Sequence, residues 1–437
     1  MFKAPSPASL AMGEGREDSS PHSREEGTSG LKSSFSFVRG NLLVLIASWT
    51  CFNFVFGMVF PYETLYMSEL GATPLVIGLL AALGQALLFT SRILGGYVAD
   101  KYGRRDVIVF MTFGVAISYV FYAVAPDWRL LVLGIIMNNL CLLYQPALQA
   151  ITADSIPPEK RGIGYALANV LPQVPSTVAP LVAKMLIEEF GFLEGMRIAY
   201  WLVVLGSLVA ADIRLLFLKE TLETGEKIRA RELVGEFKRS VKEMFNAIKA
   251  MPGQLKIFTI IMLISVVEEP VFHLFMSLYV VDVIGISKPD WALLSMSWSI
   301  TMLAIGIPLG RAVDVLGRKK ALIMAYLFWI PSTWYFVFFC RSFLELLVIM
   351  VLFSLGGALF GPAHQALVAD LTPKEMRGRI MGAIGNLNII AAAGASALAG
   401  FLYDTDPRYP FMACIGVSLL TLSLTILFIR EPGRKME

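Results

Sequence analysis

Long apolar runs separated by short charged loops dominate the sequence. Twelve stretches each contain about 20 mostly apolar residues, the length that a helix needs to cross a lipid bilayer. Hydrophobic residues make up 56% of the chain and charged residues 16%, against roughly 25% charged in soluble domains. We therefore predict an all-α integral membrane protein with twelve transmembrane helices. They are expected at 41–62, 75–98, 107–126, 129–153, 162–187, 197–218, 256–281, 290–310, 320–340, 344–369, 379–403 and 409–430.

Two sequence patterns occur twice, which indicates an internal duplication. GYVADKYGRR at 96–105 is echoed by GRAVDVLGRK at 310–319, and PALQAITADSIPPEKRG at 146–162 is echoed by PAHQALVADLTPKEMRG at 362–378. The offsets are 214 and 216 residues, and two echoes at nearly one offset indicate two similar halves in tandem. We predict an N-terminal six-helix bundle at 37–218 and a C-terminal six-helix bundle at 256–432.

The segments outside the two bundles are polar. Residues 1–36 are rich in Ser, Gly, Pro and Glu and contain no apolar run, so we expect a disordered cytoplasmic arm. Within the linker at 219–255, apolar residues recur at helical spacing between lysines and arginines. This pattern is typical of an amphipathic helix on the inner membrane surface, with a solvated tether as the alternative. Residues 433–437 are expected to form a short cytoplasmic tail.

The distribution of Lys and Arg predicts the orientation in the membrane. If both termini share one side, that side carries 29 of the 37 Lys and Arg residues, and the five loops on the other side carry five. Cytoplasmic loops are enriched in these residues, so both termini are expected in the cytoplasm, in a multi-pass protein of the plasma membrane. The net charge of +3 is the small excess of 37 Lys and Arg over 34 Asp and Glu, and it gives no case for nucleic-acid binding. We expect a monomer with the bilayer and a small-molecule substrate as partners, and no nucleic acid.

Neither catalytic nor metal-binding motifs are found. The four cysteines occur singly inside predicted helices, without the spacing of a zinc site. The sequence contains no nucleotide-binding loop and no nucleophile triad pattern. We therefore expect no enzyme activity, no metal and no cofactor, and a proton gradient as the energy source.

The repeated loops resemble the signature loops of the major facilitator superfamily. The pattern Gly-x-x-x-Asp-x-x-Gly-Arg-basic at 96–105 and 310–319 carries the resemblance, together with the Asp-to-Arg-Gly loops at 154–162 and 370–378. The likeness extends over 38–432. It implies two six-helix bundles related by a pseudo-twofold axis along the membrane normal, a substrate cavity between them near the midplane, and transport by alternating access.

The repeated loops are also candidates for a cytoplasmic gate. Small glycines at 96 and 310 are expected to let a neighbouring helix approach closely, and glycines at 103 and 317 to form tight turns. The aspartates at 100 and 314 are expected to meet the positive end of a nearby helix. Asp154 is expected to form an ion pair with Arg161, and Asp370 with Arg377; these pairs would favour the state in which the cytoplasmic side is closed. The alternative is that these residues only fix loop geometry. The candidate gate comprises Gly96, Asp100, Gly103, Arg104, Asp154, Arg161, Gly310, Asp314, Gly317, Arg318, Asp370 and Arg377.

The predicted seventh helix carries the candidate proton-coupling residues. Glu268 and Glu269 lie near the middle of this span, and His273 follows Glu269 by four residues, on the same helical face. Pro270 removes a backbone donor at this point and loosens the helix. Ionisable groups at mid-membrane are costly and mark functional sites; a purely structural carboxylate pair is the alternative. The corresponding part of the first helix, near Asn53, is expected to contain no acid.

Polar and aromatic residues within other spans are candidates for the substrate cavity, although each is equally suited to a hydrogen bond between helices. They are Asn53, Tyr62, Gln85, Asn138, Gln173, Trp298, Asn386 and Asn388.

The function we expect is secondary active transport of a small solute, with proton-coupled efflux of an amphipathic or drug-like compound as the leading hypothesis. The 20 methionines and mostly apolar spans suit an adaptable cavity. Proton-driven drug exporters of the resembled family usually carry an Arg midway along the fourth helix, where this chain has Gly134. Uptake of an organic acid, sugar or peptide, by proton coupling or facilitated diffusion, is the alternative, and a non-transporting membrane sensor is the second.

Overall fold

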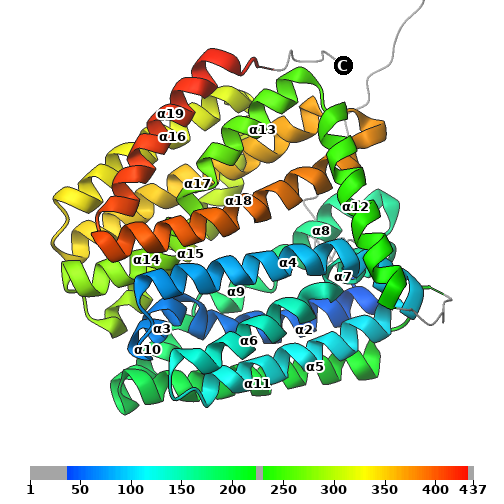
Figure 1. Ribbon diagram of the computed structural model, residues 1–437, viewed down its shortest axis with the longest axis horizontal. Helices are drawn as coiled ribbons and strands as arrows, with labels where there is room; N and C mark the ends of the chain where they lie inside the picture. Colours follow the sequence, from blue (N-terminus) through cyan, green and yellow to red (C-terminus); the bar gives the residue numbers. More distant parts are fainter. Residues whose placement is uncertain (1–36, 223–229, 432–437) are drawn as a thin grey trace, which may run out of the picture. The chain divides into compact units, whose positions relative to one another are not determined.

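The computed structural model describes residues 37–222 and 230–431, and within these ranges every regular element is a helix (Figure 1). The predicted arm at 1–36 and tail at 433–437 lie outside the described residues. By the density of internal contacts the chain divides into Met1–Arg39 and Gly40–Glu437, and all the helices belong to the second unit.

In the described part of the chain, twelve helical stretches are long and apolar enough to cross a membrane, as predicted. Most extend a few residues beyond the predicted bounds, because helix ends carry polar caps that an apolar run does not include. Eight spans are continuous: α4 (Pro74–Tyr102), α5 (Arg104–Ala123), α11 (Phe192–Phe217), α15 (Lys288–Leu316), α16 (Arg318–Phe338), α17 (Phe343–Leu371), α18 (Arg377–Thr405, after a 3-10 turn at Lys374–Met376) and α19 (Tyr409–Phe428).

The first, fourth, fifth and seventh spans are interrupted. Proline lies at or beside each interruption, where it removes a backbone donor from the helix. The first span consists of α2 (Asn41–Val59), η2 (Phe60–Tyr62) and α3 (Glu63–Glu69), and the fourth of α6 (Trp128–Cys141), η3 (Leu142–Tyr144) and α7 (Gln145–Ser155). The fifth consists of η4 (Pro158–Lys160), α8 (Arg161–Val170), α9 (Gln173–Ser176) and α10 (Ala179–Phe190), and the seventh of α13 (Gly253–Ser265), α14 (Glu268–Leu278) and η5 (Tyr279–Ile284).

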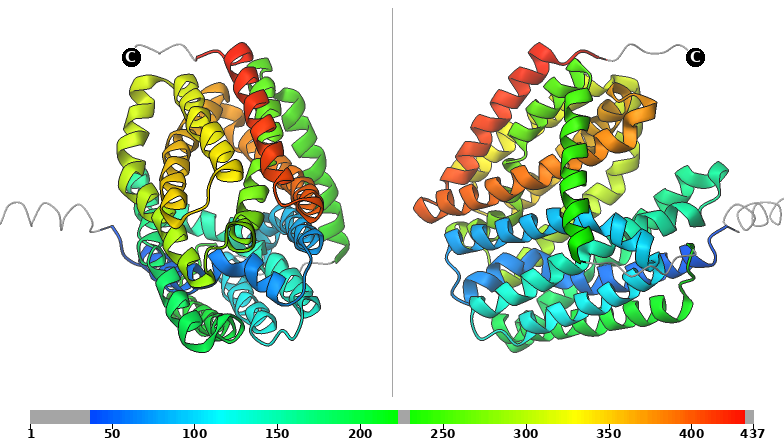
Figure 2. Two further views of the ribbon diagram at one scale, coloured as in Figure 1. Left: turned by 90° about the vertical axis from the view of Figure 1, so that its left-hand side faces the viewer. Right: turned by 45° about the vertical axis from the view of Figure 1, so that its right-hand side comes forward.

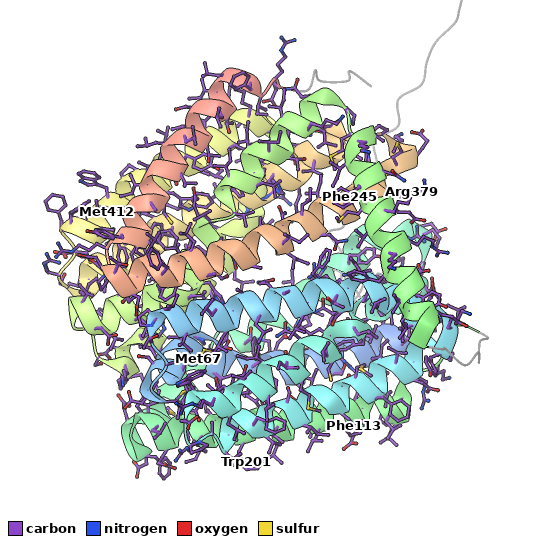
Figure 3. All side chains as sticks on the ribbon, viewed as in Figure 1. Met67, Phe113, Trp201, Phe245, Arg379 and Met412 are labelled. Carbon is purple, nitrogen blue, oxygen red and sulfur yellow. The ribbon has the colours of Figure 1, made fainter. Side chains whose placement is uncertain are left out.

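The spans form two halves, α2–α11 in the lower part of Figure 1 and α13–α19 in the upper part. The halves pack through α4 against α18, α10 against α15, and α3 against α14. Buried aromatic side chains fill the core; the ring centroid of Tyr200 lies 5.0 Å from that of Tyr66 and 5.1 Å from that of Tyr122. The outer surface is also apolar: Trp201 projects from α11 with 44% of its surface exposed (Figure 3). An apolar exterior around an apolar core is the arrangement that a lipid environment requires.

The two ends of the helical unit differ in how their helices begin. We call the end with the loops at 103, 156–157, 317 and 372–373 the basic end, and the other the opposite end. At the opposite end, side chains of Thr73, Asp127 and Ser287 accept hydrogen bonds from the first turns of α4, α6 and α15. At the basic end, α5 and α16 follow Gly103 and Gly317, whose φ angles of 99° and 95° produce the expected tight turns.

The linker contains the helix α12 (Ala230–Ala250), which crosses both halves. Figure 2 shows it passing over α4 and α18, and residue contacts join it to both. The Phe237 ring lies 6.3 Å from that of Phe89 on α4, perpendicular to it. Near its other end, Met244 and Ala247 are buried with the core of the C-terminal half. The apolar face predicted to meet the membrane surface therefore packs against protein.

At the opposite end, α4 and α18 approach each other closely. A Cβ atom added to Gly78 would lie 2.8 Å from the Cα of Gly400. By contrast, a Cβ atom at Gly96 or Gly310 would meet nothing within 4 Å. The prediction of close packing at Gly96 and Gly310 is therefore wrong for this conformation, because the halves meet at the other end.

Candidate functional site

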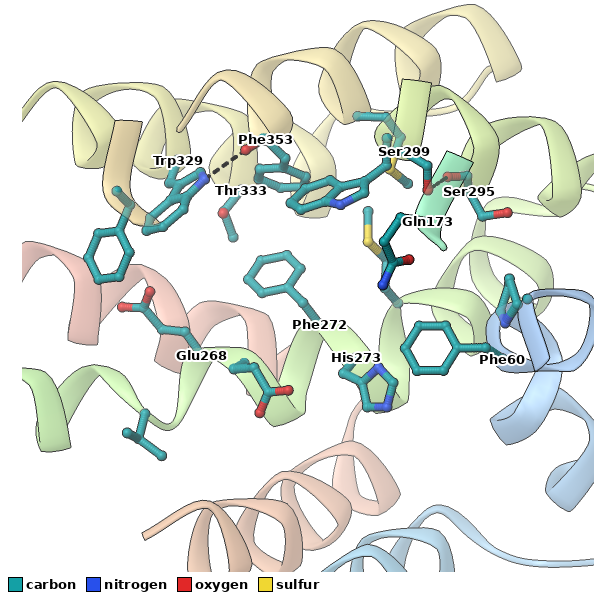
Figure 4. Close-up of a pocket in the computed structure, with 18 of the residues that line it drawn as sticks. Phe60, Gln173, Glu268, Phe272, His273, Ser295, Ser299, Trp329, Thr333 and Phe353 are labelled. Atoms are coloured by element: carbon teal, nitrogen blue, oxygen red, sulfur yellow. Dashed lines mark hydrogen bonds between the residues drawn. The ribbon is translucent and has the colours of Figure 1, made fainter. Parts of the chain in front are cut away.

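A cavity of about 840 Å³ lies between the two halves (Figure 4). Trp329 is held in its wall by a hydrogen bond from Nε1 to the Phe353 carbonyl at 3.0 Å. The described residues lining the cavity include Glu268 and Glu269 but neither Lys nor Arg. Its walls therefore combine a large aromatic surface with acidic groups. The aromatic lining residues are Phe56, Phe60, Phe272, Trp291, Trp298, Trp329, Phe353 and Phe360.

The carboxylates occupy the first turn of α14, directly after the interruption of the seventh span. The helix stops at Ser265 and restarts at Glu268, and Pro270 fits the first turn because the amide there needs no helical acceptor. A helix start favours negative charge, and irregular backbone at membrane depth is tolerated where it faces a cavity. The proline-linked break therefore displays both acids toward the cavity.

The two carboxylates differ in their surroundings. The side chain of Glu268 is half-buried and accepts a hydrogen bond from Ser418 Oγ at 2.9 Å, whereas that of Glu269 is exposed to the cavity. His273 also faces the cavity, with its ring 4.9 Å from that of Phe60 in the other half. Glu269 and His273 line the same two cavities, four residues apart on one helix, and among the described residues no hydrogen bond or ion pair links them.

The structure places the eight predicted cavity residues in different locations. Asn53, Gln173, Trp298 and Asn388 line the large cavity. Gln85 and Asn138 instead line a neighbouring cavity of about 230 Å³. Tyr62 and Asn386 line neither of these cavities: the Tyr62 ring is buried and its hydroxyl donates to the Pro289 carbonyl at 3.5 Å. Helix spacing did not distinguish these faces, because each span carries polar residues on more than one side.

The first span contains an acid beyond the stretch near Asn53, for which none was predicted. Glu63 is the first residue of α3, after the 3-10 turn that interrupts the span, and it lines the smaller cavity with Glu269 and His273. The prediction ended this span at residue 62, whereas the structure extends it to Glu69. The run Pro61-Tyr62-Glu63 repeats the association of proline and acid in the seventh span, and this signal was available in the sequence.

The halves are joined at the opposite end by a set of polar contacts, which we call the end seal. Lys184 Nζ lies 3.0 Å from Asp290 Oδ1, and Lys288 pairs with Glu69. Trp291 Nε1 donates to the Pro61 carbonyl at 2.7 Å. The seal also includes hydrogen bonds between Tyr62 and Pro289 and between Thr64 and Ser277. These contacts close the opposite end.

At the basic end, the repeated loops form ion pairs within each half. Asp154 pairs with Arg104 at 2.6 Å, not with Arg161, and Asp370 pairs with Arg318 at 3.2 Å. Arg377 instead donates to the Ala369 carbonyl at 3.1 Å. The predicted partners are wrong because the turns at Gly103 and Gly317 bring Arg104 and Arg318 closer to the aspartates.

Asp100 and Asp314 were expected to lie at the positive start of a nearby helix, but two glutamates that the prediction missed occupy these positions. Glu220 accepts a hydrogen bond from the Arg105 amide at 2.8 Å, at the start of α5. Glu431 accepts from the amides of Arg318 and Lys319 at 2.7 and 2.8 Å, at the start of α16. Asp100 forms an ion pair with the Arg104 side chain at 3.7 Å, and Asp314 is exposed. A third echo, Phe-Leu-Lys-Glu at 217–220 and Phe-Ile-Arg-Glu at 428–431, marks these positions.

Comparison with known proteins defines the family. The model of the Major Facilitator Superfamily matches residues 41–287 and 258–437. Together with the twelve spans, this match shows that the chain belongs to that superfamily and is a multi-pass membrane transporter.

Named relatives and solved structures cover most of the chain. It is 24% identical to the multi-drug resistance efflux pump PmrA of Streptococcus pneumoniae, over 81% of this chain and 90% of the pump. It is 23% identical to a Na⁺, Li⁺, K⁺/H⁺ antiporter of Planococcus maritimus, over 76% of this chain and 82% of the antiporter. The nucleoside transporter NupG shares the fold, with a TM-score of 0.71, 14% identity and coverage of 89% and 100%.

Proposed function

We propose that the protein exports an amphipathic organic cation in exchange for protons. The observation that carries this proposal is the composition of the large cavity, whose lining combines eight large aromatic side chains with Glu268 and Glu269. Aromatic faces attract organic cations, and a carboxylate in a desolvated site gains most from an opposite charge. The cavity of about 840 Å³ has the size of sites for drug-sized molecules.

Coupling follows from competition for the same carboxylates. A proton and a cationic solute each neutralise Glu268 or Glu269, so binding of one favours release of the other. If each half-cycle carries only one of the two, a proton gradient drives the solute in the other direction. Alternating access supplies the two half-cycles, with the end seal closed in one and broken in the other.

The orientation supports export. The basic end carries most of the Lys and Arg residues in the loops, and this bias favours a cytoplasmic location for that end. In this conformation the seal lies at the opposite end, which corresponds to the outside, so the cavity is positioned to load from the cytoplasm. The names of relatives such as PmrA agree with this direction.

Uptake of an organic acid is less well supported. A solute anion at this depth needs a fixed positive charge, and the described lining offers only His273 and His364 beside the two acids. The cavity therefore favours a cation over an anion.

Transport in proteoliposomes tests the proposal, with tetraphenylphosphonium and ethidium as probes. Under an imposed pH gradient the native chain should accumulate probe against its concentration gradient. Glu268→Gln and Glu269→Gln remove a proton-binding carboxylate without changing side-chain size, and at least one of them should abolish accumulation. Glu194→Gln, at an exposed ion pair with Arg197, is the matched control and should behave like the native chain.

The outcomes separate the alternatives. Accumulation that survives in both cavity variants would show that coupling lies elsewhere. Probe movement only down its own gradient in the native chain would show a facilitator, and preferential movement of anionic probes would overturn the proposed substrate class.

A further inference from the structure

The smaller cavity has the features of a binding site of its own. It encloses about 230 Å³ beside the large cavity and shares Glu269 and His273 with it. This volume is below the roughly 300 Å³ of the smallest drug-sized pockets, but it has room for an ion with several waters, since each water takes about 30 Å³. Its polar lining comes from α3, α4, α5, α6, α11, α14 and α18, and includes Glu63, Gln85, Tyr122, Asn138 and Tyr200.

Glu63 gives this cavity a carboxylate that belongs to the N-terminal half. Its side chain interacts with the Tyr122 hydroxyl and, electrostatically, with His273. No Lys or Arg is among the described residues that line the cavity. A carboxylate surrounded by tyrosine rings, with neither Lys nor Arg in the lining, is a costly arrangement that a bound cation would stabilise.

The hydroxyl of Tyr200 independently indicates a missing ligand. The side chain is 1% exposed and lines the smaller cavity, and its oxygen has no hydrogen-bond partner. The ring is fixed by neighbours, with centroids 5.1 Å from Tyr122 and 5.0 Å from Tyr66. A buried hydroxyl without a partner costs free energy, and an ion or ion-bound water in the cavity would satisfy it.

We propose that the smaller cavity binds an alkali cation, with Glu63 as its charged ligand and the Tyr200 hydroxyl as a neutral one. Carboxylate, hydroxyl and amide oxygens are the ligands of hard cations. Asn138 supplies such an oxygen, because its Nδ2 is engaged by Ser118 Oγ at 3.1 Å. The described residues contain no cluster of three His, Cys, Asp or Glu side chains suited to a transition metal. The low charge of the oxygen set favours a monovalent ion over Mg²⁺ or Ca²⁺.

Protons compete with this cation. The titratable groups that face Glu63 are Tyr119 and Tyr122 from α5, Tyr200 from α11, and Glu269 and His273 from α14. A proton on Glu63 removes the negative charge that holds the cation, and a proton on His273 adds repulsion. Bound cation therefore decreases as the pH falls.

Equilibrium binding of ²²Na⁺ to the purified full-length chain in detergent tests the inference without requiring transport, so its result is independent of the proposed export. The native chain should bind one Na⁺ in a saturable manner, with release by excess unlabelled Na⁺ and by acid. Glu63→Gln should reduce binding at least tenfold at sub-saturating Na⁺. Tyr200→Phe should weaken it by about fivefold, the effect of one hydrogen-bonding group. Glu243→Gln, on the exposed face of α12, is the matched control.

Three outcomes would overturn the inference: no saturable Na⁺ or K⁺ binding to the native chain, Glu63→Gln that binds like the native chain, or Tyr200→Phe that binds equally well. Elution in size-exclusion chromatography and thermal melting identify a variant that has not folded. Tyr200→Phe removes a single oxygen from a packed ring, so this variant should fold. It therefore tests the cation site even if Glu63→Gln is unstable.

Discussion

At the residue scale, Arg214 is a fully buried cation at the last turn of α11, with 1% of its surface exposed. Its guanidinium donates to Ser48 Oγ at 3.0 Å and to Thr112 Oγ1 at 2.7 Å, and it lies 5.5 Å from the centre of the Tyr144 ring. Each hydroxyl in turn donates to a carbonyl of its own helix. One side chain therefore joins α11 to the first, third and fourth spans, and a helix C-terminus favours its charge.

Arg214→Ala should destabilise the N-terminal half. Truncating a buried side chain of this size costs about 2–5 kcal/mol, so the melting temperature of the purified protein should fall by several degrees. The loss is measured by intrinsic fluorescence during heating in detergent. Arg129→Ala, where the side chain is 73% exposed, is the control and should leave the melting curve unchanged. Equal melting temperatures of the two variants would show that Arg214 does not stabilise this half.

The candidate site was only partly predictable at this scale. Glu268, Glu269 and His273 were predicted to be functional because ionisable groups are rare in apolar spans, and the structure places all three at the large cavity; their role in coupling stays a prediction. Glu63 was missed because the apolar run was ended one residue too early. Which acid meets which base across a turn depends on backbone geometry at Gly103 and Gly317, so sequence spacing alone led to the wrong partners for Asp154 and Asp370.

At the element scale, α12 links the halves from outside the twelve spans. One end contacts α4, where the Tyr97 hydroxyl donates to Glu232 at 3.2 Å, and the other packs on the C-terminal half through Met244 and Ala247. Because the helix contacts both halves, a change in their relative position has to move or release one of its ends.

Phe237→Asp should detach α12 from α4 and expose it to protease. The aromatic contact with Phe89 contributes about 0.5–1.5 kcal/mol, so trypsin cleavage after Lys238, Arg239 or Lys242 should become about two- to tenfold faster. The control is Phe245→Asp, because the Phe245 side chain is 53% exposed on the same helix (Figure 3). Equal cleavage rates in the two variants would show that the contact with α4 does not hold the helix.

The periodic apolar residues between 233 and 248 predicted this helix, but they did not predict the surface on which it packs. An apolar face of this width fits a membrane surface and a protein groove equally well. Only the juxtaposition of α4 and α18, which are distant in sequence, provides the surface on which α12 packs.

At the scale of the whole molecule, the end seal holds the halves together at one end. Its ion pairs are partly exposed, and each such pair contributes about 0.2–1 kcal/mol. The seal is thus a set of weak contacts that a transport cycle can break and restore.

Asp290→Ala should open the opposite end more often. Loss of the pair with Lys184 should raise the labelling rate of a cysteine in the large cavity, introduced as Ser295→Cys with Cys51→Ser, by about two- to fivefold. A membrane-impermeant thiol reagent added from the side of the opposite end reports this rate. Glu194→Ala breaks an ion pair that lies within one half at the same end, and its labelling rate should match the parent. A parent-like rate for Asp290→Ala would show that the pair does not hold the seal.

The duplicated loops were sufficient to predict two six-helix halves and the family fold, because each repeat marks the same point of each half. They did not predict which end is closed. Two conformations of one chain satisfy the same repeat, and their balance depends on small contacts such as those of Lys184 and Lys288.

The contact between Gly78 and Gly400 has a mechanical consequence. Backbone meets backbone there, so in this conformation the two helices can tilt about a fulcrum set by this contact. From Gly78 to Gly96 the helix measures about 27 Å, at 1.5 Å per residue. A tilt of about 10° at the fulcrum therefore swings the far tip by about 5 Å, roughly one helical turn. A bulky molecule lodged between the far ends of α4 and α18 would block this movement without entering the binding cavity.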